Sequence, residues 1–184
     1  MTKNTGDKIP SRAECDELMM RYSMLPNIVE HSRQVMNVSL TIISNLKSGV
    51  TVNRDLVIAA ALLHDITKTR SLETREHHDT SGGALLRELG FRSTAIIVEQ
   101  HVIITNLKLE GRLEEREIVY YADKRVLHDT IVTIEERVHD LIQRYGTTEG
   151  IRNQILRNKI QMLAVERKIT GLMAINLHRV IPVK

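Results

Sequence analysis

Apolar residues recur at spacings of three and four along most of this chain, the pattern of helices that bury one face. Prolines occur only at positions 10, 26 and 182, so the long interior contains no obligatory helix breaker. Glycines such as Gly49, Gly90 and Gly146 stand between the apolar segments, where helices commonly end. The pattern predicts an all-α protein built as a single-domain helical bundle.

The helix boundaries follow from local signals. Ser11 and Glu14 form a capping-box pair, Pro26 restarts the chain, and Asn53 is a good N-cap. The third helix runs toward the pair His64-Asp65, and the fourth ends at Gly90. The expected helices cover about 11–24, 26–48, 53–64, 79–89, 93–106, 112–126, 131–144 and 151–167, with a short segment reaching 177.

Residues 93–106 are ambiguous. Their β-branched runs, 95–98 and 102–104, would suit a buried strand as well as a helix. A lone strand would have no partner elsewhere in the sequence, so we expect a helix.

Composition narrows the class of protein. A chain of 184 residues fits one domain, and 42% hydrophobic with 27% charged residues is ordinary for a soluble protein. The longest apolar run, Leu56 to Leu63, is far too short to cross a bilayer, and the polar N-terminus does not resemble a secretory signal. Cys15 is the single cysteine, which excludes an internal disulfide and a thiolate zinc cage. We therefore expect a cytoplasmic protein without a membrane partner.

Charge is unevenly distributed. The net charge is +3, yet residues 150–184 hold seven Lys or Arg against Glu166 alone. Such a segment could meet nucleic acid or an anionic substrate, or it could simply be a solvated helix face. Five aromatic residues and no Trp argue against a stacking platform for nucleic acid. The apolar face of 151–163 could cover the domain, which we favour, or a second subunit in a homodimer.

Histidines and aspartates supply the candidate chemistry. His31, His64-Asp65, His78 and His101 fall on or beside predicted helices, and Asp123 follows Tyr120-Tyr121-Ala122. Imidazole and carboxylate groups suit divalent metals in catalytic sites. Neighbours on a helix point about 100° apart, so His64 and Asp65 could share an ion only at a helix end. A lone histidine is more often structural, and His128, His139 and His178 are expected at the surface.

Together, these stretches resemble the HD superfamily of metal-dependent phosphohydrolases. The matching segments are NIVEHSRQV, AAALLHDITK and IVYYADKRV, while HDTSGGALLRELGF and VEQHV resemble the two-histidine extension of the HDIG-type subfamily. The resemblance covers roughly residues 15–145. The central run reads HDITK, with Thr67 where the subfamily name has glycine. The Gly-Tyr-Pro triplet of the cyclic-di-GMP phosphodiesterase branch is absent.

The resemblance implies a role for each matched residue. His31, His64, Asp65 and Asp123 would hold a first divalent ion, and Asp65 would bridge to a second ion held by His78 and His101. His77 adjoins His78 and could be the ligand instead; the spacing to Gly90 favours His78. Lys68 would face the substrate phosphate, and Lys124 and Arg125 are further candidates for contacting it. The ion, one or two per chain, could be Fe, Mn, Ni, Co, Zn or Mg.

The implied activity is hydrolysis of a phosphoester or phosphoanhydride (an EC 3.1 or 3.6 reaction) by metal-activated water, with Asp65 and Lys68 central. The substrate would be a nucleotide or another small phosphorylated molecule, with a diadenosine-tetraphosphate-type dinucleotide as one option. A nucleic-acid-binding protein or nuclease and a non-catalytic metal-binding scaffold are the alternatives. The expected organisation is a tail over 1–10, an HD domain over 11–146 and a basic helical extension over 147–184.

Overall fold

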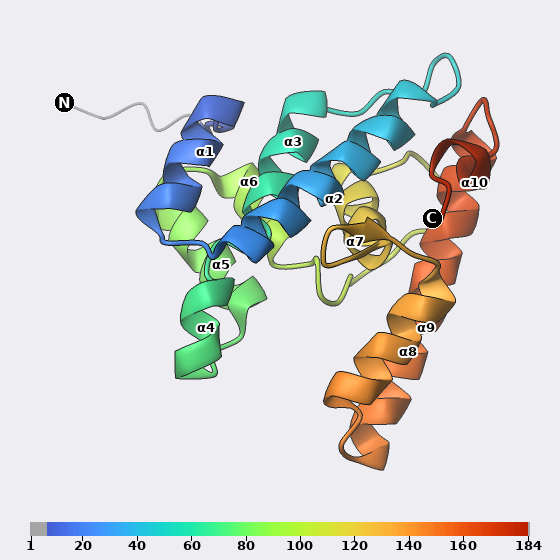
Figure 1. The fold of residues 1–184 in the computed structure, drawn as a ribbon. Helices are drawn as coiled ribbons and strands as arrows, with labels where there is room; N and C mark the ends of the chain where they lie inside the picture. The colour runs from blue at the N-terminus through green and yellow to red at the C-terminus, as the bar shows by residue number, and fades with distance from the viewer. Residues whose placement is uncertain (1–6, 184) are drawn as a thin grey trace.

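The computed structural model describes residues 7–183, and nearly all of its regular secondary structure is helical (Figure 1). The expected all-α class is confirmed. The helices are α1 (Arg12–Arg21), α2 (Pro26–Ser44), α3 (Arg54–Leu63), α4 (Lys68–Thr74), α5 (His78–Glu88), α6 (Arg92–Val98), α7 (Glu115–Lys124), α8 (Ile134–Tyr145), α9 (Glu149–Leu172) and α10 (Leu177–Val180). Two short antiparallel strands, β1 (Val126–Leu127) and β2 (Thr130–Ile131), form a hairpin.

The predicted start signals form in the structure. The capping box at Ser11 has both of its hydrogen bonds, Pro26 is the first residue of α2, and the Asn53 side chain accepts a hydrogen bond from Leu56 N. Each cap satisfies backbone N–H groups that the helix itself leaves unpaired. These signals fix where α1, α2 and α3 begin.

The centre of the core is the contact of α2 with α3 and α7. Val35 and Ile42 of α2, Ala60 of α3 and Ile118 of α7 are all fully buried. Small alanines at 59–61 let α3 lie close to its neighbours, while α5 and α6 pair beside it. This arrangement brings the C-terminal end of α3 to the middle of the molecule.

Three segments differ from the sequence-based expectation. The chain after Val98 turns irregularly as far as α7, so the expected helix over 93–106 is wrong in its second half. Residues 68–74 form α4, which we did not expect, and residues 126–131 form the β1–β2 hairpin rather than the end of one helix and the start of another. Each difference lies beside the His/Asp residues described below.

The C-terminal part of the chain belongs to the same core. Met162, Val165 and Ile169 of α9 are buried, and Leu46 forms a backbone bridge with Met173. The first half of α9 instead runs beside α8, and the two helices project from the body as a pair (Figure 1). Residues 147–183 therefore both close the core and build a projecting wall.

The expected N-terminal tail lies partly outside the described residues. Of its described part, Pro10 is buried and Asp7 accepts a hydrogen bond from Ser93 N at 3.1 Å. Residues 7–10 therefore lie against the body of the protein. Among residues 7–183, no helix combines the length and apolar character that a membrane span requires.

Cys15 provides a test of this packing. Its side chain is fully buried in α1, and burial raises the pKa of the thiol to about 12. Because the thiolate is the reactive species, we expect the native thiol to react with Ellman's reagent only as fast as the protein unfolds. Stopped-flow labelling across a urea series checks this. Rapid labelling of the native protein would contradict the packing of α1.

Candidate metal centre

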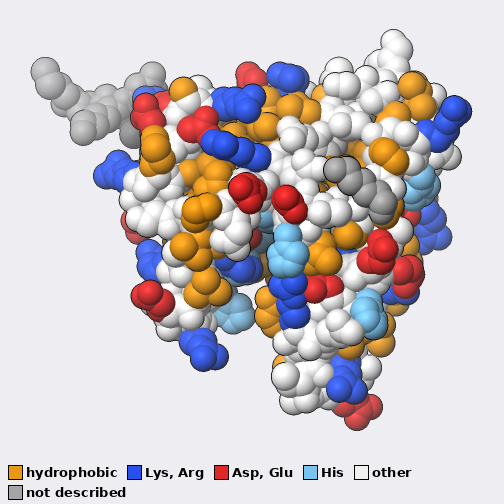
Figure 2. Space-filling model, in the orientation of Figure 1, with side chains coloured by type: hydrophobic (Ala, Val, Ile, Leu, Met, Phe, Trp, Pro, Cys, Tyr) orange, Lys and Arg blue, Asp and Glu red, His pale blue; other side chains and the backbone are white. Residues whose placement is uncertain are grey.

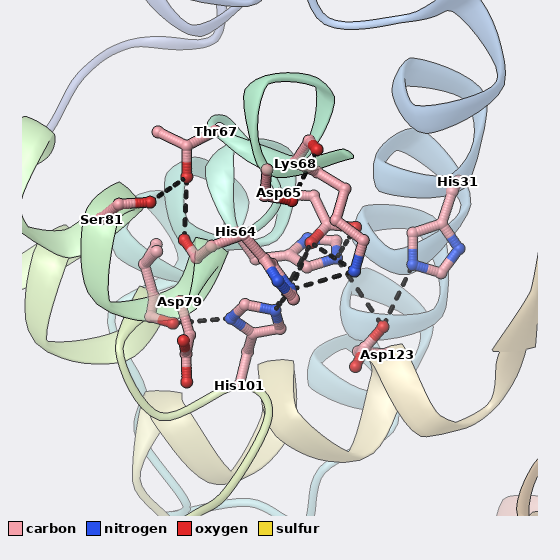
Figure 3. A network of polar contacts seen from close by, with 12 residues as sticks. His31, His64, Asp65, Thr67, Lys68, Asp79, Ser81, His101 and Asp123 are labelled. Atoms are coloured by element: carbon pink, nitrogen blue, oxygen red, sulfur yellow. Dashed lines mark hydrogen bonds and ion pairs between the residues drawn. The ribbon is translucent and has the colours of Figure 1, made fainter. Parts of the chain in front are cut away.

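Six His and Asp side chains from five parts of the chain point toward one place (Figure 3). His31 comes from the second turn of α2, and Asp123 from the end of α7. His64 is the C-cap of α3, so Asp65 already lies in the turn that follows. His78 opens α5, and His101 follows the end of α6. Helix α3 therefore ends at the His64-Asp65 pair, and this allows both side chains to face one metal centre.

The side chains form two groups. In the first, His31 Nε2 lies 3.1 Å from Asp123 Oδ1, and His64 Nε2 lies 3.7 Å from the same oxygen. In the second, His78 Nε2 and His101 Nε2 lie 3.1 and 3.5 Å from Asp65 Oδ1. Asp65 joins the two groups: its ligand atoms lie within 4.8 Å of those of His31 and His64, which are equally close to one another, and the same holds for Asp65, His78 and His101.

Asp65 belongs to both groups. Its Oδ2 lies 3.6 Å from His64 Nε2, while its Oδ1 faces His78 and His101. One carboxylate thus presents a different oxygen to each set of imidazoles. This is the arrangement that a bridging carboxylate between two ions needs.

The backbone orients three of the histidines. His31 Nδ1 donates to His128 O at 2.7 Å, His64 Nδ1 to Ala61 O at 2.8 Å, and His101 Nδ1 to Val98 O at 2.6 Å. With Nδ1 donating to the backbone, each ring turns Nε2 toward the centre, and Nε2 is the atom that binds metal when the ring is neutral. Burial opposes protonation of His31, but the Asp123 carboxylate, 3.1 Å from His31 Nε2, raises the pKa of this ring above its ordinary value. Main-chain carbonyls thus orient these three rings.

The centre contains buried polar atoms that a cation would satisfy. Among the described residues, His64 Nε2 and Asp65 Oδ1 are inaccessible to solvent and have no hydrogen-bond partner. Both atoms lie among the imidazoles of the centre, His64 Nε2 3.7 Å from Asp123 Oδ1 and Asp65 Oδ1 3.5 Å from His101 Nε2. Buried groups of this kind are costly unless something satisfies them. The residues therefore fit a site for divalent ions, which prefer neutral imidazole and carboxylate ligands.

Burial and neighbouring charges set the protonation states for metal binding. Burial lowers the pKa of His64 to about 4 and also lowers the pKa of His78, so both rings favour the neutral form. Burial opposes ionisation of Asp65, but His64 and Lys68 hold its pKa well below the ordinary value. Burial likewise opposes ionisation of Asp123, but Lys124 and His31 hold the pKa of its carboxyl well below the ordinary value. Neutral imidazoles and ionised carboxylates are the forms that bind metal.

His78 is placed by the turn that follows His64. Thr67 is buried and donates from Oγ1 to His78 O at 2.9 Å. Its hydroxyl oxygen also lies 2.9 Å from Ser81 Oγ. Thr67 thereby ties the turn to the first residues of α5. His77 is the exposed N-cap of α5, and His78 is the member of the pair that faces Asp65.

Two of the three expected phosphate contacts line the site. Lys68 is half-buried, with Nζ 3.1 Å from His78 Nε2 and 3.9 Å from Asp65 Oδ1. Lys124 is buried, and its Nζ donates to Asp123 Oδ2 at 2.6 Å and to His101 O at 2.7 Å. Lys124 thus joins a side chain of the first group to the backbone of the second.

Arg125 is not brought to the site. Its fully buried guanidinium donates to Val132 O, to the Tyr121 hydroxyl and to Ile181 O, at 2.6, 2.6 and 3.2 Å. Residues two apart on a helix project about 200° apart, so Asp123 and Arg125 face opposite sides of α7. The expectation that Arg125 contacts phosphate is therefore corrected: it joins α7 to the C-terminal segment.

A cavity of about 1050 Å³ opens from the centre. It runs between α4 and the α8–α9 pair, where Figure 2 shows a hollow edged by histidine and Lys or Arg side chains. Sequence analysis missed several residues of its wall, among them His128, Arg137, Arg144 and Asn158. His128 acts through its carbonyl group, which no sequence signal reveals, and the others lie in helices whose position only the fold defines.

Comparisons with known proteins agree with this geometry. A model of the HD domain family matches residues 28–128. An uncharacterized protein of Methanocaldococcus jannaschii is 30% identical over 148 aligned residues, covering 72% of this chain and 86% of that protein. No solved structure matches the chain.

Proposed function

The chain belongs to the HD domain family of metal-dependent phosphohydrolases, and we propose that it hydrolyses a phosphoester or phosphoanhydride bond of a small substrate, with a nucleotide as the favoured class. The family match reaches from the helix of His31 to the hairpin that follows Asp123. The observation that carries the proposal is the placement of Asp65 between two sets of inward-facing imidazoles. This geometry supports the two-histidine, two-ion form of the centre.

Each residue of the centre has a distinct part in the proposal. His31, His64, Asp65 and Asp123 would hold one ion, and Asp65, His78 and His101 the other. Divalent ions in such a centre supply a water nucleophile at neutral pH and polarise the phosphoryl group. Lys68 would donate from Nζ to a phosphate oxygen at the rim of the cavity. Lys124, which donates to both Asp123 Oδ2 and His101 O, would hold these two groups in position.

A small substrate agrees better with the structure than nucleic acid does. Several cations of the basic C-terminal segment are already engaged: Lys159 pairs with Glu135, Lys168 with Glu117, and Arg152 donates to Gly146 O. They do not form a free electrostatic surface for a phosphate backbone. The enclosed centre and the cavity beside it favour a ligand that fits inside.

The proposal is tested on protein purified without chelators or an affinity metal. We expect about two ions per chain by mass spectrometry, and release of phosphate or nucleotide from a panel of p-nitrophenyl phosphate, nucleoside mono- and triphosphates and dinucleoside polyphosphates. Chelation should abolish turnover, and Mn²⁺ or Fe²⁺ should restore it. Absence of hydrolysis across the panel, after reconstitution with each candidate metal, would refute an enzymatic role.

The second group of ligands can be tested by itself. Replacing His101 with Ala removes an imidazole that faces Asp65 Oδ1 but leaves His31, His64 and Asp123 in place. We expect metal content to fall from about two ions to about one per chain. The exposed His139, replaced by Ala, is the matched control. Equal metal content in wild type and H101A would contradict the two-ion arrangement.

Lys68 can be tested without disturbing the ligands. In Lys68→Met the long apolar side chain remains, but the cation facing the centre is lost. Because fixed charges at a reacting phosphoryl group act on the transition state, we expect kcat/KM to fall by roughly 100-fold with unchanged metal content. Lys108→Met, on the exposed surface, is the control. Unchanged turnover in K68M would remove Lys68 from the site.

A further inference from the structure

The α8 wall of the cavity holds two arginines on one aspartate. Arg137 Nη1 lies 3.2 Å from Asp140 Oδ2, and Arg144 Nε lies 2.7 Å from Asp140 Oδ1. Both arginines line the cavity. A single carboxylate fixes the two guanidinium groups in place and leaves one positive charge uncompensated. The cluster therefore presents oriented N–H donors and net positive charge to the cavity.

Arg137 has a donor that the fold leaves unused. Its side chain is 16% exposed, and within residues 7–183 its Nε is buried with no hydrogen-bond partner. A guanidinium that uses only Nη1 has further N–H groups in the fork geometry that matches phosphate. A buried unpaired donor is costly, and an anion bound in the cavity would satisfy it.

The other charged residues around the cavity also favour an anionic ligand. The carboxylates that line it are Asp65 and Asp123, both turned into the metal centre. The remaining charged lining residues of the described chain are all cations, namely Lys68, Lys124, Arg137, Arg144 and Arg157. The space beyond the centre is therefore suited to negative charge at some distance from the bond to be cleaved.

The α8 wall is also tied to the centre. The His128 carbonyl accepts from His31 Nδ1, and the same residue's Nε2 lies 3.0 Å from Arg144 Nη2. His128 adopts a left-handed backbone conformation, with φ of 55°, in the hairpin between the two sites. One residue thus sets the position of a metal-ligand candidate and of an arginine in the cavity wall.

We propose that Arg137 and Arg144 form a second anion site, which binds a further phosphate group of the substrate while the scissile phosphate lies at the metal centre. This inference rests on the proposed function and specifies its substrate class as a nucleotide that carries more than one phosphate. The cavity volume agrees, because about 1050 Å³ is at the upper end for small-molecule sites and far exceeds what a simple phosphomonoester fills.

Direct binding tests the site without catalysis. Chelator-treated protein is titrated with inorganic tripolyphosphate by calorimetry, for wild type, Arg137→Gln, Arg144→Gln and the control Arg167→Gln on the exposed surface of α9. We expect wild type and R167Q to bind alike, and R137Q and R144Q to bind about 10- to 100-fold more weakly, as loss of charge-assisted hydrogen bonds predicts. Equal binding by all four proteins would overturn the proposal.

Kinetics then separate this site from the centre. We expect R137Q and R144Q to lose about 10- to 100-fold in kcat/KM for a nucleoside triphosphate, to stay within about twofold of wild type for p-nitrophenyl phosphate, and to keep the wild-type metal content. Equal losses on both substrates would overturn the second site while leaving the hydrolase intact. If no substrate is turned over, the proposed function fails, and the tripolyphosphate titration still decides the arginine site.

Discussion

Asp65→Ala is expected to lose both bound ions and nearly all hydrolysis. The substitution removes the carboxylate that faces both sets of imidazoles, so each set loses an anionic ligand. Loss of a merely supporting partner costs about 10- to 100-fold in metal-site activity, so loss of a shared ligand should exceed 100-fold. Metal analysis and phosphate release measure the two effects separately.

Thermal unfolding gives a reading that needs no substrate. A ligand that binds only the folded state at 100 times its Kd stabilises that state by about 2.7 kcal/mol. We expect Mn²⁺ to raise the Tm of chelator-treated wild type and of Asp55→Ala, whose carboxylate is exposed at the start of α3, and to leave the Tm of D65A unchanged. Wild-type metal content and turnover in D65A would refute the assignment of the centre.

Arg125→Met is expected to destabilise the fold by about 3–5 kcal/mol, as measured by urea denaturation, because each buried acceptor left without its donor costs about 1–3 kcal/mol. The variant keeps an apolar side chain of similar length but removes the donors to Val132 O, Tyr121 Oη and Ile181 O. The Tyr121 hydroxyl in turn donates to Glu166 Oε2 at 2.6 Å, so the variant leaves this link between α7 and α9 without the Arg125 donor beside it.

The same variant decides between a structural and a substrate-binding role. The fraction of Arg125→Met that folds should bind metal and substrate as wild type does. Arg167→Met, at an exposed position, should change stability by no more than about 0.5 kcal/mol. Near-normal stability combined with a raised KM would restore Arg125 to the substrate contacts expected from the sequence.

The fold was predictable where its determinants are local. Caps at Ser11 and Asn53 and the break at Pro26 act on neighbouring residues, so they can be recognised without tertiary context. Helix α4 could not be found in this way, because none of its residues is buried and Leu72 is 60% exposed. The apolar signal stays strong beyond Val98, but the helix ends there and the chain turns to bring His101 inward, where its Nδ1 bonds Val98 O.

The candidate centre was predictable in its members but not in its surroundings. The resemblance to the HD superfamily singled out side chains such as Asp65 and His101, which the fold then brings together. Adjacency to Asp123 suggested Arg125 equally well as Lys124, because the sequence does not show which way each residue faces around α7. The wall that contains Arg137 depends on where α8 and α9 meet the domain, a long-range outcome without a local signal.

The use of main-chain carbonyls to hold His31, His64 and His101 has a consequence for how the protein can diverge. Every residue has a carbonyl group, so substitution at Ala61, Val98 or His128 does not by itself delete these supports. Relatives can therefore change side chains at these positions, within what the packing and the backbone conformation allow, and still inherit correctly turned imidazoles. Loss of the centre in a descendant would then require replacement of a ligand itself or a shift of the backbone, which makes the ligand positions the place to look for relatives that have abandoned catalysis.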